Sequence, residues 1–158
     1  MKDFLIAFFT NFTLMVPIAS WFLCQILKTV INAVVDGKLD IKRLFGDGGM
    51  PSGHSATVAS LMVMVGWEMG FDSAIFAVCS IFAIIVMHDA SGVRRETGKQ
   101  AVSIKKLAEI VNKAFLSKDN EIKTQNLKVL VGHTNLQVFF GALFGVLIAV
   151  LSIFIFSL

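Results

Sequence analysis

The chain has 158 residues, 56% of them hydrophobic, and its mean hydropathy of +0.77 lies far above that of a soluble globular domain. Its 14 basic and 11 acidic side chains cluster between apolar runs, a pattern that excludes a soluble domain and predicts a small polytopic membrane protein. Cys24 and Cys79 both lie inside apolar runs, so they indicate neither a disulfide nor a cysteine metal site.

Four apolar runs in the sequence are candidates for membrane-spanning helices. The second and third are near the short limit for a hydrocarbon core of about 30 Å, and a short interfacial piece over residues 4–13 precedes the first. In chain order the four runs cover residues 14–35, 55–69, 73–88 and 136–158.

The polar stretch over residues 91–132 separates the third run from the fourth. Ile104, Leu107 and Ala108 follow helical spacing against neighbouring lysines, which predicts one or two amphipathic helices on the membrane surface. The predicted fold is therefore all-α: a polytopic membrane helix bundle of about four transmembrane helices with an amphipathic surface insertion. We expect it to form a single domain over residues 1–158.

The segment Gly48–Ser55 leads from a glycine-rich turn into the second apolar run. Pro51 suits the first turn of a helix, and Ser52 can accept a hydrogen bond from the free N–H groups there. Small residues let an anion approach the positive end of the helix dipole, and His54 can exchange a proton with it. The segment therefore predicts a phosphate site with an acid–base group, unless it is a plain loop-to-helix junction with a capping serine.

If all four runs cross the membrane, the three histidines of the chain share one face. The end of the first run, the start of the second, the end of the third and the start of the fourth then lie on the same side. This coincidence favours a functional site on that face. The polar residues gathered there are Lys28, Ser52, Gly53, His54, His88, Asp89, Arg94, Arg95 and His133.

The basic residues are distributed unevenly between the two faces. Thirteen of the 14 Lys and Arg residues fall on the histidine face, and Lys2 falls on the other. The positive-inside rule therefore predicts a multi-pass protein of the cell membrane with a cytoplasmic histidine face and both termini on the opposite side. Part of the basic excess could instead serve phosphate binding or attract anionic lipids.

Lys28 lies about two turns inside the first apolar run, where a lysine is costly unless it reaches the interface or meets a counter-charge. One interpretation is that its side chain snorkels to the membrane surface. The other is that it points across the bundle toward an anion bound near Ser52 and His54. The sequence leaves both interpretations open.

The segment Pro51–His54 resembles the central motif of the type 2 phosphatidic acid phosphatase and vanadium haloperoxidase superfamily. More closely, the chain resembles a divergent branch of that superfamily, formed by small bacterial and plant membrane proteins. The stretches that carry the resemblance are 48–55, 89–95 with Gly98 and Ala101, and 132–145, together with Lys28.

The resemblance implies metal-independent phosphoryl transfer through a phosphohistidine, with no cofactor. Carried over by position, His133 is the nucleophile and His54 the general acid, while Lys28 helps to hold the phosphoryl group. Ser52 and Gly53 contribute amide groups and a hydroxyl to the same phosphoryl oxygens.

The sequence departs from the superfamily pattern at three places. Val35 and Asp36 stand where the pattern has Arg-Pro, and Asn126 and Leu127 stand where it has Ser-Arg. Gln137 occupies the position of the aspartate that orients the nucleophile. An amide can orient an imidazole by a hydrogen bond, but it cannot offset the charge of an imidazolium.

Residues at the end of the third run could compensate for these departures. Arg94 and Arg95 could supply the missing cations, and Asp89 could supply the missing carboxylate. Alternatively, the arginine pair anchors the helix end in the membrane, and Asp89 forms a structural ion pair with it. His88 is expected to be an interfacial residue outside the site. Gly141 and Gly145 predict close helix packing, either within the chain or in a homodimer.

The leading functional hypothesis is a membrane phosphatase or phosphotransferase that acts on a lipid phosphate or pyrophosphate. The departures favour an alternative, a catalytically inactive relative that binds an anion or a lipid as a membrane component. A third hypothesis is a zinc or iron site built from His54, His88, Asp89 and His133. The expected partners are the lipid phosphate and membrane lipids, with no nucleic acid.

Overall fold

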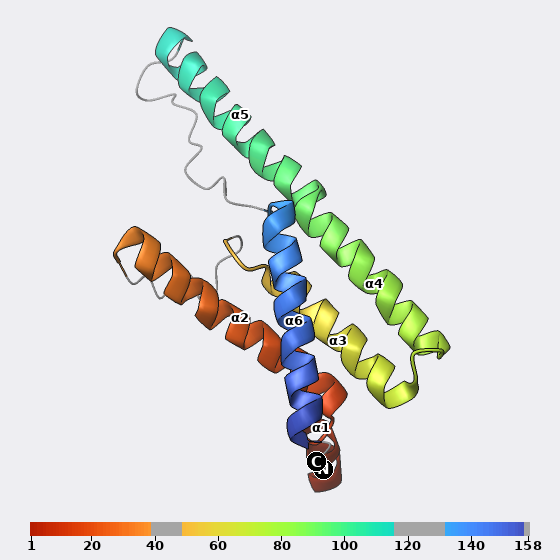
Figure 1. The fold of residues 1–158 in the computed structure, drawn as a ribbon. Coiled ribbons are helices and arrows are strands. Elements are labelled where there is room, and N and C mark those ends of the chain that lie inside the picture. The colour runs from red at the N-terminus through yellow and green to blue at the C-terminus, as the bar shows by residue number, and fades with distance from the viewer. Residues whose placement is uncertain (39–48, 116–131, 157–158) are drawn as a thin grey trace.

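The computed structural model describes residues 1–38, 49–115 and 132–156 (Figure 1). In these ranges the chain forms helices joined by short connections and no strand, so the predicted all-α membrane bundle is confirmed. The helices are α1 (Lys2–Phe9), α2 (Phe12–Asp36), α3 (Gly53–Met69), α4 (Ala74–Ser91), α5 (Val93–Phe115) and α6 (Asn135–Phe156).

Helix α3 is the centre of the bundle and packs against α6, α2 and α4 (Figure 1). It is rich in small residues, and Ser55, Ala56, Ala59 and Ser60 are all buried at its interfaces. Small side chains let helix backbones approach closely, which is the main source of packing energy between helices in a membrane. The hydroxyl of Ser20 on α2 also donates to the carbonyl of Ala56, at 3.3 Å.

In the described part, three of the four expected spans are long and apolar enough by themselves to cross a membrane. They are α2, α6 and the rod that begins with α4 at Ala74. The run predicted over 55–69 forms α3, whose 17 residues are about 26 Å long at 1.5 Å per residue. It is short because it begins at the buried Gly53, inside the bundle, and ends at Gly70.

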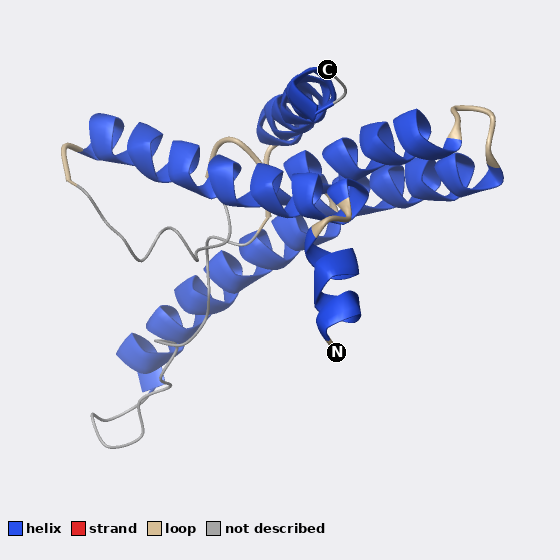
Figure 2. Cartoon of the chain, turned by 90° about the horizontal axis from the view of Figure 1, so that it is seen from below, coloured by secondary structure: helices blue, strands red, loops and turns tan. Residues whose placement is uncertain are grey.

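Helix α5 follows directly from α4 and extends out of the bundle (Figures 1 and 2). The two helices meet at Gly92, whose N–H donates to the carbonyl of His88 at 2.8 Å. The predicted amphipathic helix is therefore present. It follows α4 out of the bundle and does not fold back against the other described helices. The rest of the predicted insertion, residues 116–131, lies outside the described residues.

A stripe of small residues on α6, formed by Gly141, Gly145 and Ala149, is buried against α3. A Cβ atom on Gly141 would lie 2.3 Å from the carbonyl oxygen of Ser52, and one on Gly145 would lie 2.2 Å from that of Ala56. The close packing predicted from the two glycines is thus within the chain. A homodimer would have to use another surface, because α3 covers this one.

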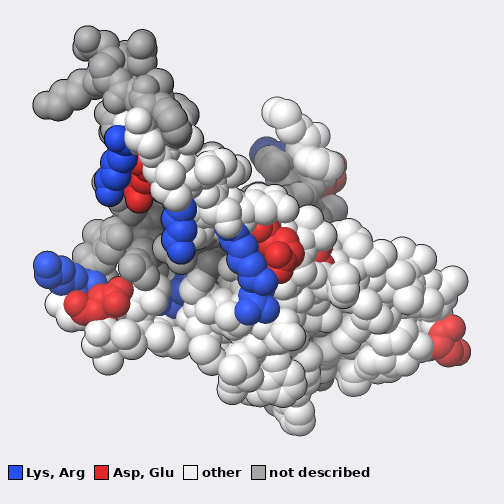
Figure 3. All heavy atoms as spheres, turned by 90° about the horizontal axis from the view of Figure 1, so that it is seen from above, with Lys and Arg blue, Asp and Glu red and all other residues white. Residues whose placement is uncertain are grey.

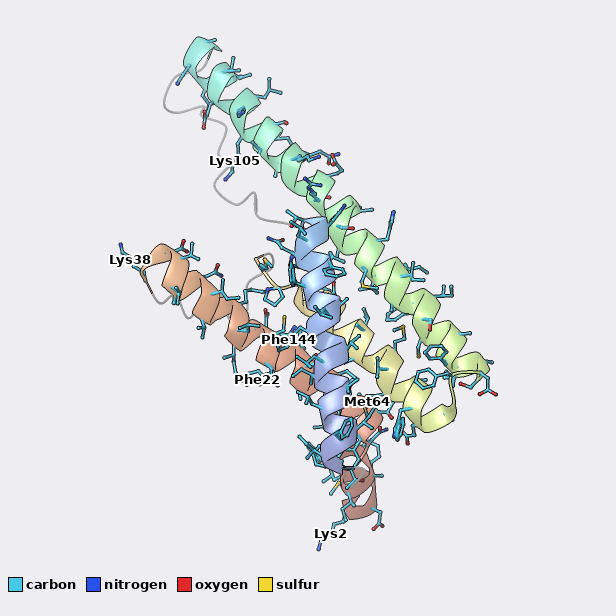
Figure 4. The ribbon with its side chains drawn as sticks, in the orientation of Figure 1. Lys2, Phe22, Lys38, Met64, Lys105 and Phe144 are labelled. Carbon is cyan, nitrogen blue, oxygen red and sulfur yellow. The ribbon has the colours of Figure 1, made fainter. Side chains whose placement is uncertain are left out.

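The two ends of the bundle differ in their content of basic residues, as the sequence predicts. The start of α1 and the end of α6 lie at the same end of the bundle (Figure 1), although not side by side (Figure 2), and Lys2 lies there as well (Figure 4). Lys38, after α2, and Lys105, on α5, lie toward the opposite end (Figure 4). The starts of α3 and α6 and the ends of α2 and α4 are directed to that basic end.

The packing of α6 on α3 predicts that Gly145→Ala destabilises the protein. The added methyl group would overlap the backbone of Ala56, so the helices must move apart, at a cost of about 1–3 kcal/mol or more. Reversible unfolding in mixed micelles measures the loss. Val150→Ile adds one methyl group to a partly exposed position of the same helix and serves as the control. Equal stability of the two variants would contradict the packing described here.

Candidate functional site

The loop that enters α3 is closed by Ser52, which caps the helix. The N–H of Ser55 donates to Ser52 Oγ at 3.4 Å, and the hydroxyl of Ser55 donates to the same atom at 3.0 Å. Ser52 is fully buried, and the Met50–Pro51 peptide before it is cis. The side chain of Ser52 therefore has the capping role that the sequence left open, while the start of α3 faces the basic end of the bundle.

Two backbone hydrogen bonds join the segments that form the site. The N–H of Ser52 donates to the carbonyl of Gln137 in α6, at 2.9 Å. The N–H of His133 donates to the carbonyl of Ala90 at the end of α4, also at 2.9 Å. Because these bonds connect α3 with α6 and α6 with α4, the position of His133 is set by three helices.

His54 and His133 form the histidine pair at the centre of the candidate site. Their ring centroids are 6.0 Å apart, and the rings meet edge to face at 65°. His133 is only 3% exposed, whereas His54 is half-buried. The structure thus brings together two of the three histidines that the sequence predicts to share one face. His88 is exposed on α4, which agrees with its interpretation as an interfacial residue.

Gln137 makes hydrogen-bond contacts both with the start of α6 and with the ring of His133. Its Oε1 accepts the N–H of Thr134 at 3.0 Å, and its own N–H donates to Thr134 Oγ1 at 3.3 Å, which forms a capping box. Oε1 also lies 3.3 Å from His133 Nδ1. Because a backbone N–H can only donate, Oε1 is the acceptor, so Nδ1 of His133 donates to it.

Lys28 is buried in the bundle rather than extended to the membrane surface. It is 3% exposed, and its Nζ donates to Oε1 of Gln25 at 2.5 Å. Its Cγ and Cδ lie 3.3 Å from the position that a Cβ on Gly49 would take, and Gly49 has a φ of +82° that favours glycine. Of the two interpretations left open by the sequence, the structure agrees with the inward-pointing one.

Gln25 and Thr134 are the site residues that the sequence reasoning missed. Gln25 is buried three residues before Lys28, and its Oε1 lies 3.8 Å from where a Cβ on Gly53 would be. A polar residue inside an apolar run was the available signal for Gln25. The Thr-x-x-Gln spacing, a known start signal for helices, was the signal for Thr134.

The surroundings of His133 favour its neutral form. Burial in the loop before α6 lowers the pKa of its imidazole below the usual 6.5, and the positive charges of Lys28 and His54 lower it further. Hydrogen bonds to Gln137 and to the backbone of Gly49 act in the opposite direction. The net effect is a neutral imidazole at pH 7.

Of the charged residues near the junction of α4 and α5, Asp89 lies nearest in sequence to a backbone contact of His133. Asp89 is half-buried and directly precedes Ala90, whose carbonyl holds His133. Arg94 and Arg95 lie in the first turn of α5, and the side chain of Arg95 is exposed. Seen from the basic end, acidic side chains lie among the basic ones on this surface (Figure 3).

The proposed metal ligands do not gather in the structure. Among the described residues, no three His, Cys, Asp or Glu side chains lie close enough together to hold a metal ion. The hypothesis of a site built from His54, His88, Asp89 and His133 therefore lacks its ligand set.

Fold and site together define an integral membrane helix bundle with a buried lysine and a histidine pair beside a glycine-rich helix start. The chain belongs to the divergent PAP2 family, whose family model matches residues 9–148. It is 42% identical over 153 residues to the uncharacterized membrane protein YuiD of Bacillus subtilis (strain 168), a match that covers 93% of this chain and 97% of the relative. No solved structure matches the chain.

The electrostatics of the site predict opposite pKa changes in two variants. Lys28→Met removes a positive charge near His133 and raises the pKa of its imidazole, whereas Gln137→Met removes a hydrogen bond that favours the charged form and lowers it. Histidine-selective NMR titration in micelles measures both changes, with the His133 signal assigned from its loss in His133→Asn. An unchanged pKa in Lys28→Met would mean that the lysine charge is not felt at His133.

Proposed function

We propose that this protein is a metal-independent membrane phosphatase or phosphotransferase that acts on a lipid phosphate or pyrophosphate through a phosphohistidine. Membership of the divergent PAP2 family relates it to phosphatases. The observation that carries the proposal is the pairing of half-buried His54 with buried His133, whose Nδ1 lies on Gln137 Oε1. Because Gln137 engages Nδ1, we assign Nε2 as the nitrogen that reacts with the substrate.

In the proposed reaction, Nε2 of neutral His133 attacks phosphorus, and the bond from phosphorus to the leaving oxygen breaks. That oxygen takes a proton from protonated His54, whose ring centroid lies 6.0 Å away. Water then attacks the phosphohistidine, with His54 accepting its proton, and inorganic phosphate leaves. In a phosphotransferase, an acceptor hydroxyl takes the place of the water.

Lys28 is the cation that we assign to the phosphoryl oxygens, assisted by the N–H groups at the start of α3, including that of Gly53. Its burial supports this role, because a buried ammonium gains most from a bound anion. Arg94 and Arg95 are proposed to add positive charge when the substrate binds. Asp89 is proposed to stabilise the imidazolium form of a site histidine, a charge that the amide of Gln137 cannot balance.

The proposed site lies on the cytoplasmic face of the cell membrane, with both termini on the other side. The supporting observation is the charge distribution: 13 of the 14 basic residues belong to the segments that connect at the site end. A lipid substrate could then place its head group at the histidine pair and keep its hydrocarbon in the bilayer.

The first test is phosphate release by the detergent-purified protein from a panel of lipid phosphates and pyrophosphates, with EDTA present. We expect turnover that survives chelation and falls below detection in His133→Ala. His54→Ala should lower the rate by about 10²–10⁴-fold, as expected for loss of a general acid. His88→Ala, which changes an exposed histidine outside the pair, is the matched control and should retain activity.

The outcomes separate the proposal from its alternative. A trapped phosphohistidine that disappears in His133→Ala would support the proposed mechanism. Saturable binding of phosphate or vanadate to the folded protein, with no release from any substrate, would instead favour a catalytically inactive relative that binds an anion or lipid as a membrane component.

The depressed pKa of His133 gives the pH dependence a definite direction. The nucleophile must be neutral, so kcat/KM should fall as the pH drops through the pKa of His133, which lies below 6.5. From neutral pH down to that value, His133 itself should cause no loss of activity. A pH–rate profile on the first substrate found measures this limb. An acid limb centred above the usual histidine value would contradict the assignment of His133 as the nucleophile.

A further inference from the structure

An apolar groove of about 240 Å³ lies between α2 and α6, next to the candidate site. Phe144 lies on its α6 wall, where that helix passes α2 (Figure 4). Several lining side chains are well exposed, including Leu143 at 54%, so the groove is open along its length. Its lining residues are Leu27, Ile31, Met50, Pro51, Phe140, Leu143, Phe144 and Leu147.

The groove adjoins the loop that leads into the candidate site. Met50 and Pro51, which line it, directly precede the capping Ser52. On α2, Leu27 lines the groove and is the neighbour of Lys28 in sequence. The groove is therefore continuous with the loop and the helix turn that carry the proposed phosphate ligands.

Helix α6 links the two regions along one face. Gln137, which holds His133, and Phe144 are seven residues apart, so they differ by only about 20° around the helix axis. Leu147, which also lines the groove, lies ten residues after Gln137, or about 15 Å along the axis. A ligand bound to both regions would thus have a polar end at the histidine pair and a hydrocarbon end that runs along α6 between α2 and α6.

We propose that this groove binds the hydrocarbon chain of the lipid phosphate substrate and so positions its phosphate beside His133. The inference rests on the proposed function, because it assigns a tail site to the same substrate. Two observations favour a hydrocarbon chain as the occupant. The lining is apolar throughout, and the groove opens between two membrane-spanning helices.

The groove acts through shape rather than through hydrophobic transfer. A chain that leaves the bilayer for the groove exchanges one apolar environment for another, so little free energy is gained from burial. What the groove can supply is a fixed direction for the chain, which holds the phosphorus near the nucleophile. We therefore expect it to discriminate by chain length.

A variant that fills the groove tests this kinetically. Leu143→Trp adds bulk to the wall, and Leu151→Trp makes the same change at a comparably exposed position of α6 outside the groove. Leu143→Trp should lower kcat/KM for a long-chain lipid phosphate by about tenfold or more and leave kcat/KM for a short-chain, water-soluble analogue unchanged. Equal effects of the two variants, or an equal loss for both substrates, would overturn the proposal.

A binding experiment keeps the proposal separate from catalysis. A long-chain lipid phosphate with a photoreactive diazirine in its chain is cross-linked to the full-length His133→Ala protein in micelles, and the labelled residues are mapped by mass spectrometry. We expect labels on Leu143, Phe144 and Leu147, reduced when Leu143 is replaced by Trp. Val78 and Ile84 are exposed on α4 and serve as reference positions outside the groove.

The outcomes are distinct. Three results would each overturn the assignment. They are labelling of the α4 positions as strong as that of the groove, equal labelling by a lipid with the same hydrocarbon chain but a neutral head group, and cross-links to a second copy of the protein. Groove labelling that depends on the phosphate would support it even if the unmodified protein released no phosphate, a result that would refute the proposed catalysis alone. Turnover without groove labelling would refute the tail site alone.

Discussion

The hydrogen bond from the N–H of Ser52 to the carbonyl of Gln137 is the contact on which the site depends. It requires the backbone of the loop before α3 to touch the first turn of α6. That approach exists because Gly141 has no side chain, since a Cβ atom there would lie 2.9 Å from the nitrogen of Ser52 and closer still to its carbonyl oxygen. The stripe of small residues on α6 therefore has two effects. It lets α6 pack closely on α3, and it keeps the start of α3 against the segment that carries His133.

Gln137 connects the stability of the fold with the chemistry of the site. Its backbone carbonyl accepts from Ser52, and its side-chain oxygen accepts from Thr134 and faces Nδ1 of His133. An aspartate at this position would add a negative charge beside a buried imidazole and favour the imidazolium. The amide instead fixes the ring without that charge. This difference distinguishes the chain from the aspartate-bearing superfamily pattern that it resembles.

Lys28 illustrates how a membrane protein can keep a cation in its interior. The aliphatic part of the side chain packs against Gly49, and the ammonium group donates to Gln25. The charge of Lys28 lies close enough to His133 to lower the pKa of its imidazole, so this interior lysine acts directly on the candidate site.

The sequence by itself determined the helix bundle, the segments that begin and end at the histidine face, and the candidates Lys28, His54 and His133, because hydropathy runs and short motifs are local properties. It also indicated the helix start at Ser52. It could not decide whether Lys28 points inward or whether Gly141 and Gly145 pack within the chain. It also gave no indication that Gln25 contacts Lys28. These outcomes depend on contacts between segments far apart in the chain, and such contacts are set only when the helices pack together.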